Sequence, residues 1–171
     1  AKAVIGKLKA PLVVDATAGL GRDSLVLQNA GAHVLMFERN PLVWLFLLDA
    51  RRRALEDSQF LATFPQGLPQ LMPYGTFISY IQKTADFKCD VIYYDPMFPS
   101  RAKKALVKKE MQIFHSLVGA DNDSISYARE LLKLPKYRTV IKRPENAPPL
   151  IPCNYSIDGK ACRFDCYLNQ Y

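Results

Sequence analysis

The sequence has no apolar run long enough to cross a membrane. Its longest hydrophobic stretch, Leu42–Leu48, has seven residues, whereas a membrane-spanning helix needs about 20. The N-terminus has neither an extended apolar segment nor a small-residue cleavage site, so we expect no signal peptide and a cytoplasmic location. It also has no initiator methionine, from which we expect that the sequence begins inside a longer protein.

The sequence also lacks the closely spaced ligands of a metal site. It contains four cysteines and two histidines: Cys89, Cys153, Cys162, Cys166, His33 and His115. No two cysteines form a C-x-x-C pair, and both histidines are far from them along the chain. Since zinc sites are built from such closely spaced pairs, we expect no metal. Cys162 and Cys166 fall on one face of an expected strand, which favours buried, reduced thiols over a disulfide framework.

The composition does not indicate disorder, and the sequence contains no internal repeats. Hydrophobic residues make up 49% of the 171 residues and charged residues 23%, as in ordinary globular proteins. This length predicts a single domain with its own buried core. Lys and Arg total 23 against 16 Asp and Glu, so the net charge is +7. A basic excess of this kind favours an anionic partner, with nucleic acid the first choice.

Strand patterns alternate with helix patterns along the chain. Short apolar runs predict strands at 11–15, 33–37, 89–94 and 137–141. Helical periodicity and capping residues predict helices at 22–30, 41–57, 104–118 and 124–134, the first of them closed by Gly31. Strands that are apolar throughout and joined by helices indicate a parallel sheet covered on both faces.

The C-terminal segment has a different pattern. Asp158-Gly159 separates two alternating runs within residues 155–164, which predicts a two-residue β-hairpin at that dipeptide. The predicted fold class is therefore α/β and Rossmann-like, a mostly parallel sheet with helices on both faces and a C-terminal antiparallel hairpin. Residues 58–88 give the least distinct pattern, although 71–74 fit a short strand. Residues 42–48 are apolar on every side of their helix, so we expect cover from more than one layer, partly from sequence outside this chain.

A glycine-rich loop, residues 15–23 (DATAGLGRD), lies between the first predicted strand and the first predicted helix. Gly19 and Gly21 let the backbone approach a ligand closely, and the helix that follows offers unpaired N–H groups. Glu38 ends the second strand, where a carboxylate can accept hydrogen bonds from both hydroxyls of a ribose. Together these features predict a site for a nucleoside-bearing cofactor.

The glycine pattern indicates which cofactor. The dinucleotide fingerprint G-x-G-x-x-G fails because Ser24 occupies its third glycine position. The loop fits better the acid-x-Gly-x-Gly-x-Gly loop that binds S-adenosylmethionine in Rossmann-like methyltransferases, with Asp15 as the acid and Thr17 in the place of the first glycine. The alternative is a plain tight turn with a surface acid.

A second loop, Asp95-Pro96-Met97-Phe98, follows the strand predicted at 89–94 and should face the same crevice. It resembles the (Asn/Asp)-Pro-Pro-(Tyr/Phe) loop of methyltransferases that modify exocyclic amines of bases, with Met97 in place of the second proline. Such an amine is a poor nucleophile because its lone pair is delocalised into the ring. The Asp95 carboxylate and the Pro96 carbonyl can accept its hydrogens and aim the lone pair, and Phe98 can stack on the base. The alternative is a proline-rich turn without chemistry.

Four segments together resemble the ribosomal RNA small subunit methyltransferase J family. They are DATAGLGRD at 15–23, FERNP at 37–41, DPMFPSRAKKALVKKEMQIFHSLVG at 95–119 and VIKRPENAPPL at 140–150. The resemblance implies that the chain is one S-adenosylmethionine-dependent domain that methylates the N2 amine of a guanosine in 16S rRNA or the small ribosomal subunit. Members of the family also carry an N-terminal region that this sequence lacks.

The resemblance also implies cofactor contacts in the glycine loop and beyond it. These map onto Arg22, Asp23, Glu38, Arg39, Gly75, Thr76 and Asp95. Gly75 departs from the small hydroxyl residue that the family carries at its position. The sulfonium of the cofactor activates the methyl group, so no metal is implied.

Basic residues gather after the Asp95 loop and at the end of a later strand. They are Arg101, Lys103, Lys104, Lys108, Lys109, Lys142 and Arg143. Their place at the rim of the same crevice favours binding of RNA phosphates over a merely solvated helix face, which remains the alternative.

Three rival functions stay open at this point. The first is methylation of another exocyclic amine in nucleic acid. The second is a nucleotide-dependent Rossmann oxidoreductase, which Ser24 disfavours and which leaves the Asp95 loop unexplained. The third is a non-catalytic RNA-binding module, for which the basic charge alone would suffice.

Overall fold

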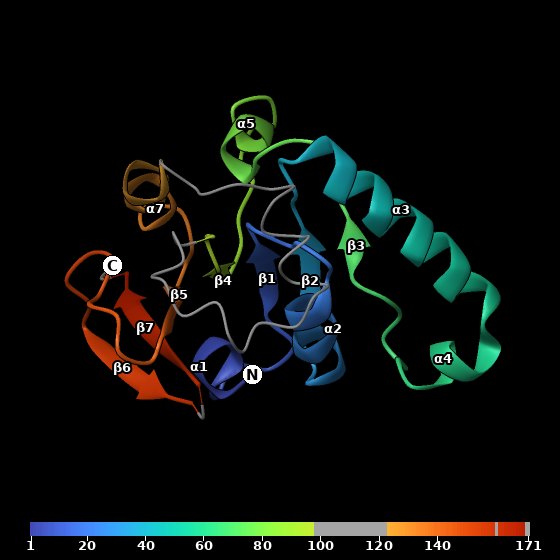
Figure 1. Ribbon diagram of the computed structural model, residues 1–171, viewed down its shortest axis with the longest axis horizontal. Helices are drawn as coiled ribbons and strands as arrows, with labels where there is room; N and C mark the ends of the chain where they lie inside the picture. Colours follow the sequence, from blue (N-terminus) through green and yellow to red (C-terminus); the bar gives the residue numbers. More distant parts are fainter. Residues whose placement is uncertain (98–122, 160, 170–171) are drawn as a thin grey trace, which may run out of the picture.

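The computed structural model describes residues 1–97, 123–159 and 161–169. These residues build a seven-stranded sheet in the order β3-β2-β1-β4-β5-β7-β6 (Figure 1). The strands are β1 (Leu12–Asp15), β2 (His33–Met36), β3 (Gln70–Leu71), β4 (Val91–Tyr94), β5 (Arg138–Pro144), β6 (Tyr155–Asp158) and β7 (Cys162–Leu168). Strands β1 to β5 are parallel, and β7 pairs antiparallel with both β5 and β6. The predicted fold class is confirmed.

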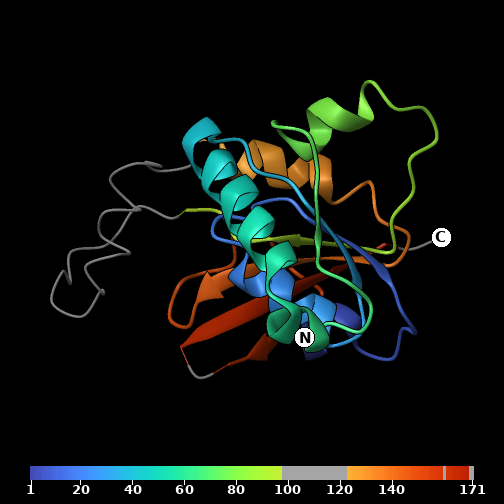
Figure 2. The same ribbon diagram turned by 90° about the vertical axis from the view of Figure 1, so that its right-hand side faces the viewer.

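Helices cover both faces of this sheet (Figure 2). They are α1 (Lys2–Ile5), α2 (Arg22–Asn29), α3 (Pro41–Glu56), α4 (Ser58–Ala62), α5 (Phe77–Ile81) and α7 (Ser124–Leu131). Within the part of the chain that the structure describes, no helix is long and apolar enough to cross a membrane.

Successive residues of the central strands enter two different cores. Val13 and Val91 pack in the core on the side of α1 and α2. Their neighbours Val14 and Ile92 pack in the core on the side of α5 and α7. Because side chains alternate along a strand and both faces are buried, the strands appear in the sequence as continuous apolar runs.

The predicted helix boundaries agree closely with the structure where it describes them. The side chain of Asn40 caps α3 by accepting hydrogen bonds from the backbone N–H groups of Leu42 and Val43. Gly31 has a φ of 101° directly after the last turn of α2, as predicted for the residue that closes the helix. The helix expected at 124–134 is α7, which ends at Leu131. The helix expected at 104–118 lies outside the described residues.

The C-terminal hairpin forms, but its turn is not at the predicted dipeptide. Asp158 pairs with Arg163, and the Gly159 N–H donates to the Cys162 carbonyl at 2.7 Å, so the chain reverses after Gly159. A reason for this register is the pair of Ser156 and Asp165, which face each other across the strands. The Ser156 hydroxyl donates to the buried Asp165 carboxylate at 2.7 Å. A turn at Asp158-Gly159 would separate these two side chains.

The apolar helix α3 is covered on one side only by the described residues. Val43 and Leu47 are buried, whereas Leu45 and Phe46 are 53% and 47% exposed. The sheet ends beside α3 in the two-residue strand β3, so the helix lies at the edge of the molecule (Figure 1). The described part of the chain thus supplies one of the expected covering layers.

All four cysteines are free, as predicted. Cys89 and Cys166 are buried, and Cys153 and Cys162 are partly buried. Burial raises the pKa of the Cys89 thiol to about 12, which keeps it protonated and unreactive.

Candidate functional site

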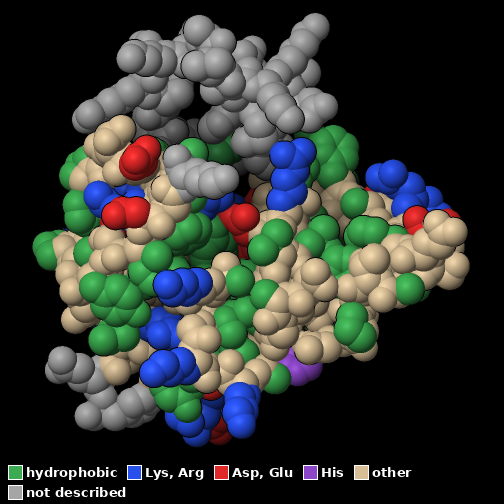
Figure 3. Space-filling model, turned by 90° about the horizontal axis from the view of Figure 1, so that it is seen from below, with side chains coloured by type: hydrophobic (Ala, Val, Ile, Leu, Met, Phe, Trp, Pro, Cys, Tyr) green, Lys and Arg blue, Asp and Glu red, His purple; other side chains and the backbone are tan. Residues whose placement is uncertain are grey.

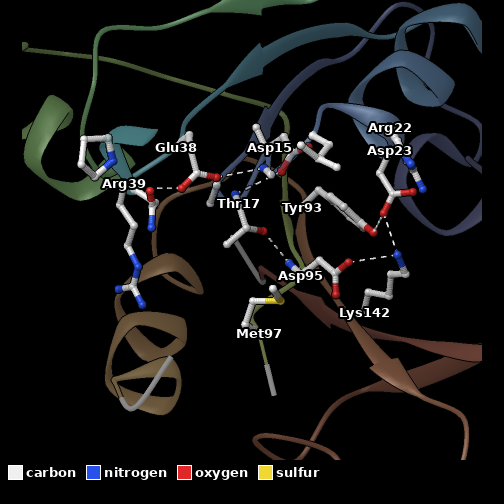
Figure 4. A pocket seen from close by; sticks show the side chains of 16 residues that line it. Asp15, Thr17, Arg22, Asp23, Glu38, Arg39, Tyr93, Asp95, Met97 and Lys142 are labelled. Carbon is white, nitrogen blue, oxygen red and sulfur yellow. Dashed lines mark hydrogen bonds and ion pairs between the residues drawn. The ribbon is translucent and has the colours of Figure 1, made fainter. Parts of the chain in front are cut away.

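An open cavity of about 520 Å³ lies at the carboxyl ends of β1, β2, β4 and β5 (Figure 4). Its size is in the range typical of small-molecule sites, and its place follows the rule for parallel α/β sheets. The lining residues come from the glycine loop, the end of β2, the Asp95 loop and β5. They are Asp15, Ala16, Thr17, Ala18, Gly19, Leu20, Arg22, Asp23, Glu38, Arg39, Asn40, Pro41, Tyr93, Asp95, Met97 and Lys142.

The glycine loop is held against its neighbours by its own backbone. The Ala16 N–H donates to the Tyr93 carbonyl and the Ala18 N–H to the Phe37 carbonyl, both at 2.9 Å. Gly21 is the N-cap of α2 with a φ of 72°, a conformation that favours glycine. A Cβ at Gly21 would lie 3.1 Å from Leu47 Cδ2, so the loop also needs glycine there for packing against α3.

The buried side chain of Asp15 stabilises the conformation of this loop. Its side chain is 1% exposed, and its two carboxylate oxygens accept hydrogen bonds from the Thr17 N–H and the Ser24 hydroxyl. Burial raises the pKa of Asp15 to about 7, against the lowering effect of these hydrogen bonds. Ser24, which breaks the dinucleotide pattern in the sequence, thus has a structural role as a partner of Asp15.

Glu38 is buried at the end of β2 with its carboxylate fixed by two backbone donors. Oε2 accepts from the Gly19 N–H at 2.9 Å and Oε1 from the Asn40 N–H at 2.7 Å. Each carboxylate oxygen has a second lone pair that can accept a ligand hydroxyl. The geometry suits the predicted contact with a ribose, because the carboxylate lines the cavity and cannot rotate freely.

A network of polar side chains connects the Asp95 loop to the glycine loop. The Asp95 N–H donates to Thr17 Oγ1 at 2.7 Å. Lys142 Nζ lies 2.8 Å from Asp23 Oδ2 and 2.9 Å from Asp95 Oδ2, and the Tyr93 hydroxyl also donates to Asp23 Oδ2 (Figure 4). One ammonium therefore bridges carboxylates from two separate loops.

The charges of this network are set by its partners. Burial raises the pKa of Asp23, but the hydrogen bonds from Lys142 and Tyr93 outweigh this effect and hold it below its usual value. Burial lowers the pKa of Lys142, but the two carboxylates outweigh it and raise the value overall. Burial and the neighbouring carboxylates raise the pKa of Tyr93. At neutral pH Lys142 is thus a fixed cation and Tyr93 a neutral donor.

Arg39 closes the opposite rim of the cavity. Its guanidinium donates two parallel hydrogen bonds to the Asp123 carboxylate, with a shortest N–O distance of 2.7 Å. This contact lowers the pKa of Asp123 and joins the end of β2 to the start of α7.

The structure brings most of the expected cofactor residues to this cavity. Those that line it are Asp15, Gly19, Arg22, Asp23, Glu38, Arg39 and Asp95. Gly21, the N-cap of α2, does not line it. Gly75 and Thr76 also lie outside it: the Gly75 N–H donates to the Glu38 carbonyl, and Thr76 caps α5 by accepting from the Ser79 N–H. They thereby support the segment after β2.

The expected catalytic and RNA-binding residues are only partly described. Pro96 follows Asp95 but does not line the cavity. Lys142 lines it, whereas the Arg143 side chain turns away and donates to the Pro148 carbonyl at 2.7 Å. The remaining expected residues lie outside the described part of the chain. They are Phe98, Arg101, Lys103, Lys104, Lys108 and Lys109.

Thr17 and Tyr93 are site residues for which the sequence analysis predicts no role. Thr17 stands in the place of a glycine in the loop motif, and its hydroxyl accepts a hydrogen bond from the Asp95 backbone. Tyr93 pairs with Asp15 across β1 and β4, so its place at the end of an apolar strand was the available signal.

A metal site is not found among the described residues, which contain no group of three or more His, Cys, Asp or Glu side chains arranged to hold an ion. The donor set instead fits S-adenosylmethionine. The lining combines the fixed Glu38 carboxylate, which can accept ribose hydroxyls, with glycine backbone and the carboxylates of Asp23 and Asp95, which suit a positively charged ligand.

Comparisons with known proteins agree with this geometry. The family described as "Putative SAM-dependent methyltransferase" matches residues 1–169. Ribosomal RNA small subunit methyltransferase J of Pectobacterium atrosepticum is 45% identical over 98% of this chain and 68% of its own length. The protein of the same name from Mannheimia succiniciproducens is 46% identical over 92% of this chain and 62% of its own. The chain thus spans about two thirds of these relatives.

Solved structures show the same fold. The SAM-dependent methyltransferase of Neisseria gonorrhoeae superposes with a TM-score of 0.70 at 34% identity, over 93% of this chain and 65% of that one. An rRNA methyltransferase of Streptomyces viridochromogenes has a TM-score of 0.55 at 10% identity, over 97% of this chain and 79% of that one, a likeness of fold alone. With the family match and the relatives above, the chain belongs to the family of SAM-dependent methyltransferases that includes ribosomal RNA small subunit methyltransferase J.

Proposed function

We propose that this protein transfers a methyl group from S-adenosylmethionine to the exocyclic N2 amine of a guanosine in 16S rRNA. The observation that carries the proposal is the arrangement of Glu38, the glycine loop and Asp95 around one cavity. The names of the relatives support ribosomal RNA as the substrate class. The choice of an exocyclic amine rests on the Asp95-Pro96 loop.

Four residues at or beside the cavity have distinct parts in the proposed binding of the cofactor. Glu38 accepts the ribose hydroxyls, while Gly19 allows the backbone to lie close to the ligand. Asp15 and Ser24 hold the loop in the conformation that makes this approach possible. When bound, S-adenosylmethionine supplies a methyl group that its positive sulfonium has already activated, so the protein contributes alignment and electrostatics.

Asp95 acts on the acceptor amine. Its carboxylate and the Pro96 carbonyl accept the amine hydrogens and direct the nitrogen lone pair at the methyl carbon. The nitrogen–carbon bond forms as the carbon–sulfur bond breaks, with its electron pair remaining on sulfur. The surplus proton on the nitrogen then passes to the Asp95 carboxylate and on to solvent.

The RNA partner is proposed from charge and sequence. Basic side chains occupy several separate places on the face shown in Figure 3, in keeping with a net charge of +7. We assign Phe98 to stacking on the base and the basic residues at 101–109 to the flanking phosphates. The small ribosomal subunit is the proposed partner, the cytoplasm the proposed location, and residues 1–171 a single methyltransferase domain.

A methyl-transfer assay with 16S rRNA from cells that lack the gene tests the function. We expect tritium from methyl-labelled S-adenosylmethionine in the RNA, and mass spectrometry should find it in N2-methylguanosine. RNA from cells that have the gene should accept no label, because its target is already modified. Label in another nucleoside, or none in either RNA, would contradict the proposal.

Calorimetry separates this function from its rivals of other classes. S-adenosylhomocysteine should bind, and NADH should not. Binding of NADH alone would favour an oxidoreductase, and binding of neither would favour a non-catalytic RNA-binding module.

A further inference from the structure

We propose that Lys142 is a positioning residue for methyl transfer, which clamps the Asp95 carboxylate to the glycine loop through Asp23. This inference rests on the proposed function and assigns to Lys142 a role at the reacting centre in place of RNA phosphate binding. The cavity shows why. Lys142 Nζ is within 2.9 Å of carboxylate oxygens from both Asp23 and Asp95, and its side chain is only 27% exposed.

The backbone of Lys142 is fixed, whereas that of Asp95 is not part of the sheet. Lys142 lies inside β5, where it pairs with Phe164 of β7. Strand β4 ends at Tyr94, one residue before Asp95. Tyr94 pairs with Ile141, so the next residue of each strand, Asp95 and Lys142, lies at the same level of the sheet. A side chain from a paired strand thus holds a loop carboxylate in place.

The clamp also balances the charges of the site. Among the described residues, the Asp95 carboxylate interacts electrostatically with Lys142 on β5, Tyr93 on β4 and Asp15 on β1. Of these, only Lys142 is a cation. Without it, the two carboxylates of Asp23 and Asp95 would repel each other across the position that the ammonium now occupies.

A fixed cation at this place has a defined chemical consequence. The raised pKa of Lys142 means that it keeps its proton, so it does not take the proton released by the amine. Instead it favours the ionised form of the carboxylate that accepts the amine hydrogens. It also restricts the rotation of that carboxylate, and small errors of alignment cost much of the rate in a two-substrate reaction.

The test compares Lys142→Met, Lys142→Arg and the surface control Lys133→Met in the same methyl-transfer assay. We expect Lys142→Met to lower kcat roughly 10- to 100-fold and to move the acid limb of the kcat profile to higher pH. Lys142→Arg, which keeps the charge, should restore part of the rate and the wild-type acid limb. Lys133 is exposed after the end of α7, so Lys133→Met should leave kcat and the acid limb of its pH profile unchanged.

Two further readouts make the outcome decisive. The salt dependence of RNA binding should be the same for wild type and Lys142→Met, because a phosphate contact would add about 0.7 to the slope. Carbon-13 NMR should show a higher pKa for Asp23 in folded Lys142→Met than in wild type, and this measurement needs no activity. An unchanged Asp23 pKa, an unchanged kcat, or a flattened salt slope at normal kcat would overturn the proposal.

Failure of the proposed function would look different. If wild-type protein transfers no methyl group to RNA, the function falls and the positioning role falls with it. If wild type is active and Lys142→Met is equally active, the function stands and only the role of Lys142 is refuted.

Discussion

The role of Glu38 in cofactor binding gives the sharpest prediction, because its surroundings allow the magnitude to be worked out. We predict that Glu38→Ala weakens the binding of S-adenosylmethionine by about 1.5–3 kcal/mol, the range for hydrogen bonds to a charged group. This corresponds to a Kd that rises roughly 10- to 150-fold. The loss should be this large because the carboxylate is 7% exposed and already oriented by two backbone donors.

The same substitution should also reduce stability. Removing the carboxylate takes the acceptor from the N–H groups of Gly19 and Asn40. Because both hydrogen bonds are only partly buried beside an open cavity, we expect each loss to cost about 0.5–1.5 kcal/mol. Glu38→Gln should fall between wild type and Glu38→Ala in both respects. Its amide keeps one acceptor oxygen but turns an NH2 group toward one of the two N–H donors.

Isothermal titration with S-adenosylhomocysteine measures the binding term, and urea unfolding measures stability. Glu130→Ala is the matched control, because Glu130 is an exposed glutamate on α7 away from the cavity. Wild-type affinity in a folded Glu38→Ala protein would remove Glu38 from the cofactor site. A loss of affinity equal in Glu130→Ala would show that the effect is not local.

Three further predictions concern turnover, pH and RNA. Asp95→Ala should lower kcat far more than it raises the Kd for the cofactor. Single-turnover assays measure the rate of methyl transfer and calorimetry measures the Kd; an unchanged rate would show that Asp95 has no part in the transfer. Asp15 has a pKa raised to about 7, so between pH 4 and 7 the folded state holds a proton that the unfolded state has lost. The free energy of unfolding of wild type, relative to that of Asp15→Asn, should therefore fall by roughly 2–4 kcal/mol as pH rises from 4 to above 7. Urea unfolding at several pH values measures this difference, and a difference that does not change with pH would refute the prediction. Lys104→Ala/Lys108→Ala should weaken RNA binding and flatten its salt dependence by about 0.7 per lost contact, at constant cofactor affinity; an unchanged salt slope would assign these lysines to solvent.

The sequence predicted the parts of the site that end an apolar strand. Asp15, Glu38 and Asp95 each follow such a run, and the carboxyl ends of parallel strands meet at one edge of the sheet. The left-handed glycines were equally legible, because few other residues adopt a φ of 53° or 72°. The local sequence pattern was therefore sufficient to predict these positions, because the end of a strand or a positive φ restricts which residue can stand there.

Contacts between distant segments could not be predicted in this way. Lys142 meets Asp23 across 119 residues and Asp95 across 47. No spacing in the sequence indicates either contact. A lysine at the end of an apolar strand predicts only a position at the rim of the crevice. The hairpin turn was misplaced for a similar reason, since the buried partner of Ser156 outweighs the preference of Asp-Gly for a tight turn.

The described lining of the cavity is weakly acidic, whereas the whole protein is basic, and this contrast bears on the proposed binding of RNA. The described lining includes four acidic residues against three cations. One of the acids, Asp15, has a pKa raised to about 7, and one of the cations, Arg39, is paired with Asp123. Such a cavity attracts a positively charged sulfonium and repels phosphate. Under the proposed function, we therefore expect the RNA backbone to stay on the basic exterior and an uncharged base to enter the cavity toward Asp95. Under the proposed function, separating the two charges in this way lets the protein bind a cation and a polyanion next to each other, which accounts for an acidic site in a protein of net charge +7.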